Sequence, residues 1–253
     1  KEEHGISTVT VYDYVTANYD DDGISETGEL VNGTKYMSTE QMIEAWAYGW
    51  VIINFHCFGW SQVYTRLYNQ NGMSYRKMYD KLVQQIKVDS GIVGETYRDA
   101  IKTMDQFLRT GKGVPGGYNL LYKGQSVFHS HRKEVIAFVD SVFTQEYLNL
   151  PNNQYYDLRK YQHAFTTGLT TNYPYSLQLN YNWPDVLLGD DIEQTTSGEY
   201  TVDCLEQDVS VDEYMMRLYA RRKQGWGKSI ITKTNLKYTH DNAEVYNIAT
   251  INR

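Results

Sequence analysis

The chain has 253 residues, of which 41% are hydrophobic and 22% are charged, a composition typical of a soluble globular protein. Its net charge of -7 and its lack of any basic block argue against a general nucleic-acid binder. Two cysteines, Cys57 and Cys204, are too few for a disulfide scaffold or a cysteine-ligated cluster. Its apolar segments are too short for a bilayer span and no signal peptide is recognisable, so we expect a cytoplasmic protein.

Tyrosine is unusually frequent, with 24 Tyr against 7 Phe. A tyrosine ring buries like a phenylalanine ring, but its hydroxyl needs water or a hydrogen-bond partner. Many tyrosines therefore suit a polar-lined cleft or an interface. They equally suit a helical domain whose half-exposed tyrosines pack by their rings.

The first predicted element is a strand in the opening stretch, where Val9 and Val11 belong to a β-branched run. The acidic stretch Asp20 to Gly23 lacks the ligand spacing of a calcium loop and is interpreted as a solvated loop. Residues 30–35 contain Asn32-Gly33, the pair typical of a type I′ turn, and predict a hairpin there.

The stretch from Ser38 to Gln70 predicts one central, buried helix. Apolar residues recur in it at steps of three and four and form a continuous seam, comprising Trp46, Trp50, Ile53, Cys57, Trp60, Tyr64 and Leu67. Ser38 with Gln41 forms a capping-box pattern at its start, and Asn71-Gly72 is expected to end it. Gly59 is expected to kink or divide this helix.

The same periodicity predicts four more helices before the apolar pattern changes to the alternation typical of strands. The first is capped by Ser74, and the other three cover residues 94–109, 132–147 and 154–167. The glycine-rich residues 111–117 stop the second of these four and lack the Gly-Lys-Ser/Thr ending of a phosphate loop.

Strict alternation of apolar and polar residues predicts strands in the last third of the chain. The predicted strands are residues 175–183, 200–204 and 229–232, and Ser210 with Glu213 predicts the start of another helix. We therefore expect a mainly α-helical α+β fold, a helical bundle around one central buried helix with a small antiparallel sheet towards the C-terminus. We expect residues 1–150 to form a helical body with an N-terminal strand or hairpin, and residues 151–253 to form a smaller α+β cap packed on it. Alternatively, the two parts form one continuous domain.

We recognise no complete combination of catalytic residues in the sequence, and no metal site is predicted. His129-Ser130-His131 offers two imidazoles but no third ligand, so Ser130 is interpreted as a helix cap with solvated neighbours. His56 lies in the most apolar part of the central helix, where a buried imidazole needs a partner. Two roles are open for His56: a structural hydrogen bond, or contact with a ligand in a cleft.

Several motifs in the first half of the chain resemble the C-terminal region of cobalamin-dependent radical S-adenosylmethionine enzymes. They are Met37-Ser38, Trp50, Asn54-Phe55-His56, Gly59-Trp60-Ser61-Gln62, and Ser74-Tyr75 with Tyr79. Tyr173 to Leu177, followed by Asn180 to Asn182, is similar to a later segment of the same region. The resemblance covers about residues 1 to 205.

This resemblance implies a C-terminal accessory domain that closes or shapes the substrate side of an upstream catalytic barrel. The cysteine motif for an iron–sulfur cluster and a cobalamin-binding domain are absent from the chain, so no catalytic residue carries over. The cluster, S-adenosylmethionine and cobalamin would belong to an upstream part of the polypeptide. His56, Trp60, Gln62 and Tyr64 are the candidate substrate-binding residues.

A second interpretation is a free-standing helical binding or interaction protein that uses its tyrosine-rich surface to hold a partner or small ligand. In the first interpretation the partners are the upstream catalytic domain and a small-molecule substrate. Neither interpretation involves nucleic acid or a membrane.

Overall fold

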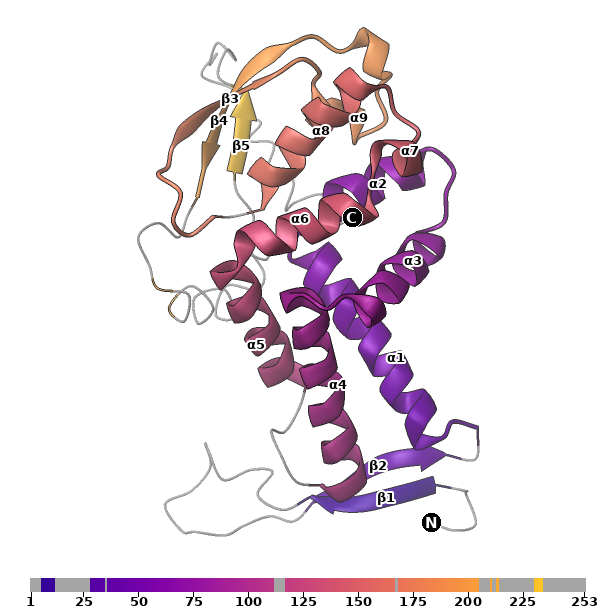
Figure 1. Ribbon diagram of the computed structural model, residues 1–253. Coiled ribbons are helices and arrows are strands. Elements are labelled where there is room, and N and C mark those ends of the chain that lie inside the picture. Colours follow the sequence, from indigo (N-terminus) through magenta and orange to yellow (C-terminus); the bar gives the residue numbers. More distant parts are fainter. Residues whose placement is uncertain are drawn as a thin grey trace, which may run out of the picture.

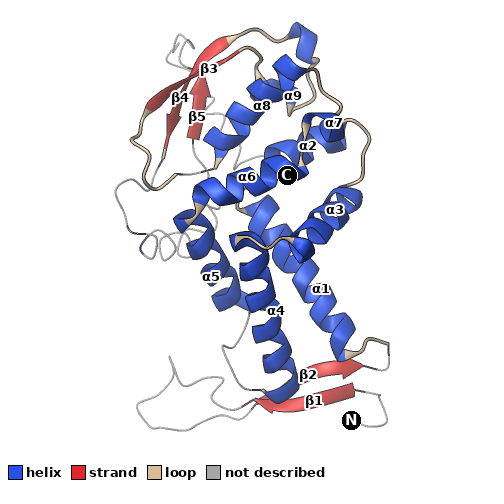
Figure 2. Ribbon diagram, viewed as in Figure 1, coloured by secondary structure: helices blue, strands red, loops and turns tan. Residues whose placement is uncertain are grey.

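The computed structural model describes residues 6–11, 28–34, 36–111, 117–166, 168–204, 210, 213 and 230–233. Helices make up most of the described chain, with a two-stranded sheet at one end and a three-stranded antiparallel sheet at the other (Figure 1; Figure 2). The predicted fold class, mainly helical α+β with a small antiparallel sheet towards the C-terminus, is confirmed. Within the described residues, no helix combines the length and apolar character needed to cross a membrane.

The two-stranded sheet pairs β1 (Ile6–Val11) with β2 (Gly28–Thr34) in antiparallel fashion. The hairpin turn predicted at Asn32-Gly33 is wrong, because both residues lie within β2. Ser7 is opposite Gly33 while Thr8 is opposite Val31, so Asn32 is the extra residue of a β-bulge. Pairing with β1 overrides the local turn preference. The predicted loop at Asp20 to Gly23 lies outside the described residues.

The predicted central helix is divided into three parts: α1 (Thr39–Ile52), the π-helical turn η2 (Ile53–Cys57) and α2 (Gln62–Gln70). The capping box is confirmed, since Ser38 Oγ accepts from the Gln41 N–H while Gln41 Oε1 accepts from the Ser38 N–H. The expected division at Gly59 is also confirmed. Gly59 has a φ of 86°, in the left-handed region that favours glycine, so the chain turns sharply before α2.

Six further helices precede the second sheet. They are α3 (Tyr75–Val88), α4 (Ile92–Thr110), α5 (Gly117–Ser130), α6 (Arg132–Val142), α7 (Gln145–Leu148) and α8 (Asn152–Phe165). The helix predicted over residues 132–147 is two helices, because Thr144 Oγ1 accepts from the Tyr147 N–H and starts α7. Helix α5 was not predicted.

The role assigned to Ser130 is also corrected by α5. Ser130 lies in the last turn of α5, and its hydroxyl donates to the Ser126 carbonyl oxygen at 2.9 Å. The residue at the N-cap of α6 is His131, with no side-chain capping bond. Ser130 is therefore the last residue of α5 and does not occupy the N-cap position, from which a serine oxygen could accept the first backbone N–H groups of α6.

The second sheet has the order β3-β4-β5, with β3 (Tyr175–Leu179), β4 (Gly198–Asp203) and β5 (Ile230–Lys233) all antiparallel. Between β3 and β4 lie α9 (Trp183–Val186) and the 3-10 turn η3 (Ile192–Gln194). All three predicted strands form, but the first ends at Leu179 rather than near Trp183.

The early end of β3 has a clear cause. Asp157 Oδ2, on α8, accepts from the backbone N–H groups of Asn180 and Tyr181 and from Trp183 Nε1. Those backbone donors are therefore not available for a sheet ladder. Further along, the Glu213 N–H donates to Ser210 Oγ at 3.1 Å, in agreement with the predicted cap, and the rest of that predicted helix lies outside the described residues.

One hydrophobic core runs through the described helices and the second sheet. Trp50, Trp60 and Trp183 are among its largest fully buried side chains. Trp50 makes edge contacts with the rings of Tyr97 and Phe128, each at 6.0 Å between centroids. Helix α8 packs on α2, so the central segment touches elements from both halves of the sequence. The division into residues 1–150 and 151–253 stays a prediction.

Candidate functional site

The π-helical turn η2 positions His56, the polar residue whose placement the sequence left open. In this turn the Phe58 N–H donates to the Ile53 carbonyl oxygen five residues back, at 3.2 Å. Such a turn inserts one extra residue into a helix and redirects the side chains that follow, and π-turns are frequent at functional sites. Asn54 and Phe55, in the same turn, are completely buried.

Buried amide groups hold η2 in this conformation. Asn54 Nδ2 donates to the Trp50 carbonyl oxygen at 2.9 Å, and its Oδ1 accepts from Gln125 Nε2 on α5 at 2.7 Å. Gln125 Oε1 in turn accepts from Trp60 Nε1 at 3.0 Å. Because Asn54 and Gln125 are both fully buried, these bonds replace water for groups that would otherwise be costly to bury.

An open cleft of about 880 Å³ lies between α1 and α3, with His56 of η2 among its lining residues. It is lined by side chains of four kinds: aromatic rings, aliphatic groups, carboxylates and basic or amide groups. The lining residues are Gln41, Glu44, Ala45, Tyr48, Ile52, His56, Tyr75, Arg76, Tyr79 and Asp80. Its volume lies within the range of about 300–1,000 Å³ that is usual for small-molecule sites.

His56 is hydrogen-bonded and also lines the cleft. Its Nδ1 lies 2.6 Å from the Tyr79 hydroxyl and 3.2 Å from Thr65 Oγ1. Thr65 Oγ1 donates to the Gln62 carbonyl oxygen at 3.1 Å, so its hydroxyl is fixed from the α2 side. The two roles left open for His56 are therefore compatible, since one ring nitrogen is anchored while the ring lines the cleft.

Two of the tyrosine hydroxyls at the cleft, those of Tyr48 and Tyr79, are held in their neutral form. Burial raises the pKa of Tyr79 well above the usual value of 10.0. Burial also raises the pKa of Tyr48, and the nearby Asp80 carboxylate raises it further. At neutral pH both phenols are therefore protonated. Such phenols can donate a hydrogen bond, as Tyr48 does to the Arg76 carbonyl oxygen at 3.3 Å.

Of the four residues predicted to bind substrate, only His56 lines this cleft. The side chains of Trp60, Gln62 and Tyr64 are at most 5% exposed and belong to the protein interior. Trp60 bonds to Gln125, and the Tyr64 hydroxyl bonds to Asp140. The structure does not bring these four residues together, because the break after η2 rotates α2 away from the face that carries His56.

Tyr48, Tyr75 and Tyr79 form the aromatic part of the cleft, and none of them was among the predicted substrate-binding residues, although Tyr75 and Tyr79 belong to a motif of the resemblance. A signal for them exists. Gln41, Ala45, Tyr48, Ile52 and His56 follow one another at steps of three or four and therefore share one stripe on the helical surface. On α3, Tyr75 and Tyr79 are four residues apart and share a stripe in the same way.

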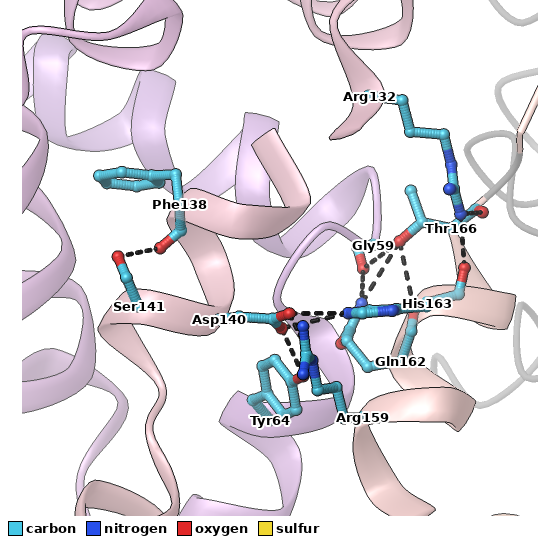
Figure 3. A network of polar contacts seen from close by, with 10 residues as sticks. All are labelled: Gly59, Tyr64, Arg132, Phe138, Asp140, Ser141, Arg159, Gln162, His163 and Thr166. Atoms are coloured by element: carbon cyan, nitrogen blue, oxygen red, sulfur yellow. Dashed lines mark hydrogen bonds and ion pairs between the residues drawn. The ribbon is translucent and has the colours of Figure 1, made fainter. Parts of the chain in front are cut away.

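A second cluster of polar side chains joins α2, α6 and α8 (Figure 3). Asp140 Oδ1 accepts from the Tyr64 hydroxyl at 2.8 Å, and Oδ2 accepts from Arg159 Nε at 2.6 Å and lies 3.0 Å from His163 Nε2. Burial acts to raise the pKa of Asp140, but the contacts with His163, Tyr64 and Arg159 outweigh it and the net pKa is lowered. Because its carboxylate contacts partners on two other helices, Asp140 of α6 links that helix to α2 and α8.

The described residues do not fit an iron–sulfur cluster. Cys57 is half-buried in η2 and Cys204 is buried just after β4, and neither takes part in a disulfide. In the part of the chain that the structure describes, no three His, Cys, Asp or Glu side chains are grouped to hold a metal ion.

No protein-family model matches the chain, and no curated protein is similar to it.

Proposed function

We propose that this chain is the substrate-proximal accessory domain of an enzyme of the cobalamin-dependent radical S-adenosylmethionine type. In this proposal the cleft between α1 and α3 holds part of a small organic substrate. The chain supplies binding groups, while an upstream part of the same polypeptide supplies the iron–sulfur cluster, S-adenosylmethionine, cobalamin and the catalytic groups.

The observation that carries the proposal is that residues from two separate motifs of the family resemblance lie at the same cleft. Asn54-Phe55-His56 and Ser74-Tyr75 with Tyr79 are separate in sequence and lie on different elements. His56 of the first motif and Tyr75 and Tyr79 of the second nevertheless line one cleft, where His56 Nδ1 and the Tyr79 hydroxyl are 2.6 Å apart. Packing in the core alone would not require these three side chains to share a solvent-accessible surface.

The chemistry of the cleft supports binding rather than catalysis. It offers aromatic rings for contact area, a histidine held in place by hydrogen bonds, and carboxylates at Glu44 and Asp80. A few fixed polar groups in a largely apolar cleft are the usual composition of a site that orients a ligand.

The first experiment reads the coding sequence upstream of Lys1. An in-frame extension that encodes three closely spaced cysteines would support the proposal. An initiation codon at or near the position of Lys1 (for example directly before it) would contradict the link to a radical enzyme and favour the free-standing binding protein instead.

The second experiment tests the cleft itself. A library of small polar and aromatic fragments is screened by ligand-observed NMR against the wild type and against Ala45→Trp, which fills the cleft from an exposed position on α1. Ala137→Trp, at an exposed position on α6, is the matched control. We expect fragments that bind the wild type and the control but not Ala45→Trp. If every fragment that binds is unaffected by Ala45→Trp, the cleft is not the binding site.

A further inference from the structure

We infer that the cleft between α1 and α3 recognises an organic ammonium cation, which it holds against three tyrosine rings with two carboxylates at the rim. This inference rests on the proposed function, in which the cleft is the ligand site, and adds the chemical class of the ligand. Three observations carry it: the arrangement of the rings, the weak pairing of the carboxylates and the balance of charge.

The rings come from both walls of the cleft. Tyr48 belongs to α1, and Tyr75 and Tyr79 belong to α3. The His56 ring stands at 90° to the Tyr75 ring and 73° to the Tyr79 ring, with centroids 5.7 and 6.0 Å apart. Tyrosine faces carry negative electrostatic potential, so several rings around one space favour a cation over a neutral group of the same shape.

The ion pairs of the two carboxylates are long, and Asp80 also interacts with the Tyr48 hydroxyl. Glu44 Oε1 lies 3.9 Å from Lys87 Nζ, and Asp80 Oδ2 lies 3.8 Å from Arg76 Nε. The side chains of Glu44 and Asp80 are 76% and 46% exposed, and such long, exposed ion pairs contribute little. A cation bound in the cleft can therefore replace these partners at small cost.

The local charge also favours a cation. Among the described lining residues, Arg76 is the only one that always carries a positive charge, and its side chain is 87% exposed and so points into solvent. Burial is the main cause of the raised pKa of Tyr48, and the effect of Asp80 in the same direction exceeds the opposing effect of Arg76. At Tyr48 the negative charge of Asp80 therefore outweighs the positive charge of Arg76.

The test compares two ligands that differ in charge but hardly in shape. Choline carries a quaternary ammonium group, and 3,3-dimethylbutan-1-ol has a carbon in place of that nitrogen. Each is titrated into the protein while the ring signals of labelled tyrosines are followed by NMR. We expect choline to shift the signals of Tyr48 and Tyr75 and to bind about tenfold more tightly than the alcohol, as expected for a cation in a partly desolvated aromatic site.

Two pairs of variants locate the effect. Asp80→Asn and Tyr75→Leu should each weaken choline binding severalfold and leave the binding of the alcohol nearly unchanged or weakened less. Asp190→Asn, exposed after α9, and Tyr156→Leu, 57% exposed on α8, carry the same changes away from the cleft and should leave choline binding as in the wild type. Because Tyr75 is exposed and Asp80 is only partly buried, these variants should fold normally.

Each outcome decides the inference. If the alcohol shifts the cleft tyrosines and binds as tightly as choline, the inference is overturned while the cleft remains a ligand site. If neither ligand shifts them, the inference is also overturned, and the fragment screen with Ala45→Trp decides the proposed function separately. If choline binds equally to all four variants and the wild type, its site lies elsewhere and the inference is likewise overturned.

Discussion

Gln162 on α8 donates from Nε2 to the carbonyl oxygen of Gly59, 2.8 Å away and 103 positions earlier in the sequence. Its Oε1 accepts from the Val63 N–H at 2.9 Å (Figure 3 shows the contact with Gly59). One buried amide thus serves a carbonyl before the start of α2 and an N–H in its first turn, groups that have no partner within the helix. The break in the central segment is therefore stabilised from α8.

Removing this amide should destabilise the protein. Gln162→Leu leaves the Val63 N–H buried without this partner, and the Gly59 carbonyl oxygen keeps only the bond from Thr166 Oγ1 at 3.3 Å. An unsatisfied buried group costs about 1–3 kcal/mol. Gln84→Leu, an exposed glutamine on α3, is the matched control and should change the free energy of unfolding by less than about 0.5 kcal/mol. Urea unfolding curves measure both. Equal stability of the two variants would show that the break does not depend on Gln162.

A pair of glycine substitutions tests how closely α5 approaches α1. At Gly124 a Cβ atom would lie 2.8 Å from Trp50 Cζ2 and 3.2 Å from Asn54 Oδ1, both in the buried core. Gly124→Ala should therefore destabilise the fold, although alanine favours a helix over glycine by about 1 kcal/mol. At Gly49, within α1, a Cβ would meet nothing within 4 Å, so Gly49→Ala should stabilise the protein by about 0.5–1 kcal/mol. Opposite signs in thermal or urea unfolding are the expected result, and a stabilised Gly124→Ala would refute the close contact.

The hydrogen bond between Tyr79 and His56 should contribute to stability. Tyr79 is 4% exposed, and Tyr79→Phe keeps the ring while removing the hydroxyl 2.6 Å from His56 Nδ1. Thr65 Oγ1 remains 3.2 Å from the same nitrogen, so we expect a loss of only about 1 kcal/mol. Tyr156→Phe, at a site 57% exposed, should lose less than about 0.5 kcal/mol. If both variants unfold at the same urea concentration, the contact with His56 adds nothing to stability.

Acid sensitivity should arise in part from His129. Its Nδ1 is shielded from solvent, and its ring centroid lies 5.2 Å from that of Trp60, even though part of the residue's surface is exposed. Burial, aided by the charge of Arg132, lowers the pKa of His129 from 6.5 to about 3. The folded protein therefore keeps this imidazole neutral where the unfolded chain protonates it.

The sign of the effect follows from these two pKa values. Below about pH 6.5 the unfolded chain binds a proton at His129 that the folded chain does not bind until about pH 3. Stability should therefore fall as the pH falls through this window, by up to roughly 1.4 kcal/mol per pH unit from this group. His129→Gln should flatten the curve of unfolding free energy against pH between 6 and 4. His131→Gln, exposed at the start of α6, should follow the wild-type curve. A His129→Gln curve as steep as the wild type would refute the assignment.

The sequence by itself determined the elements whose signals are local. Ser38 with Gln41, the period of the stripe on α3, and the alternation along β3 and β4 each involve residues a few positions apart, and the structure contains them. Interactions at such short range depend little on the rest of the chain. The apolar seam likewise predicted that the central segment would be buried.

Only the tertiary structure decided how the central segment is divided and what faces the cleft. The division after η2 depends on Gln125 and Gln162, which satisfy its backbone and side-chain groups from more than sixty positions away. Helix α5 was not predicted because Gly124 weakens its helical pattern. In the structure this glycine is needed because, without a Cβ atom, it lets α5 approach Trp50. Whether Trp60, Gln62 and Tyr64 share a face with His56 depends on the turn at Gly59. A helical period assigns faces only while the helix continues, and contacts from distant segments decide where it stops.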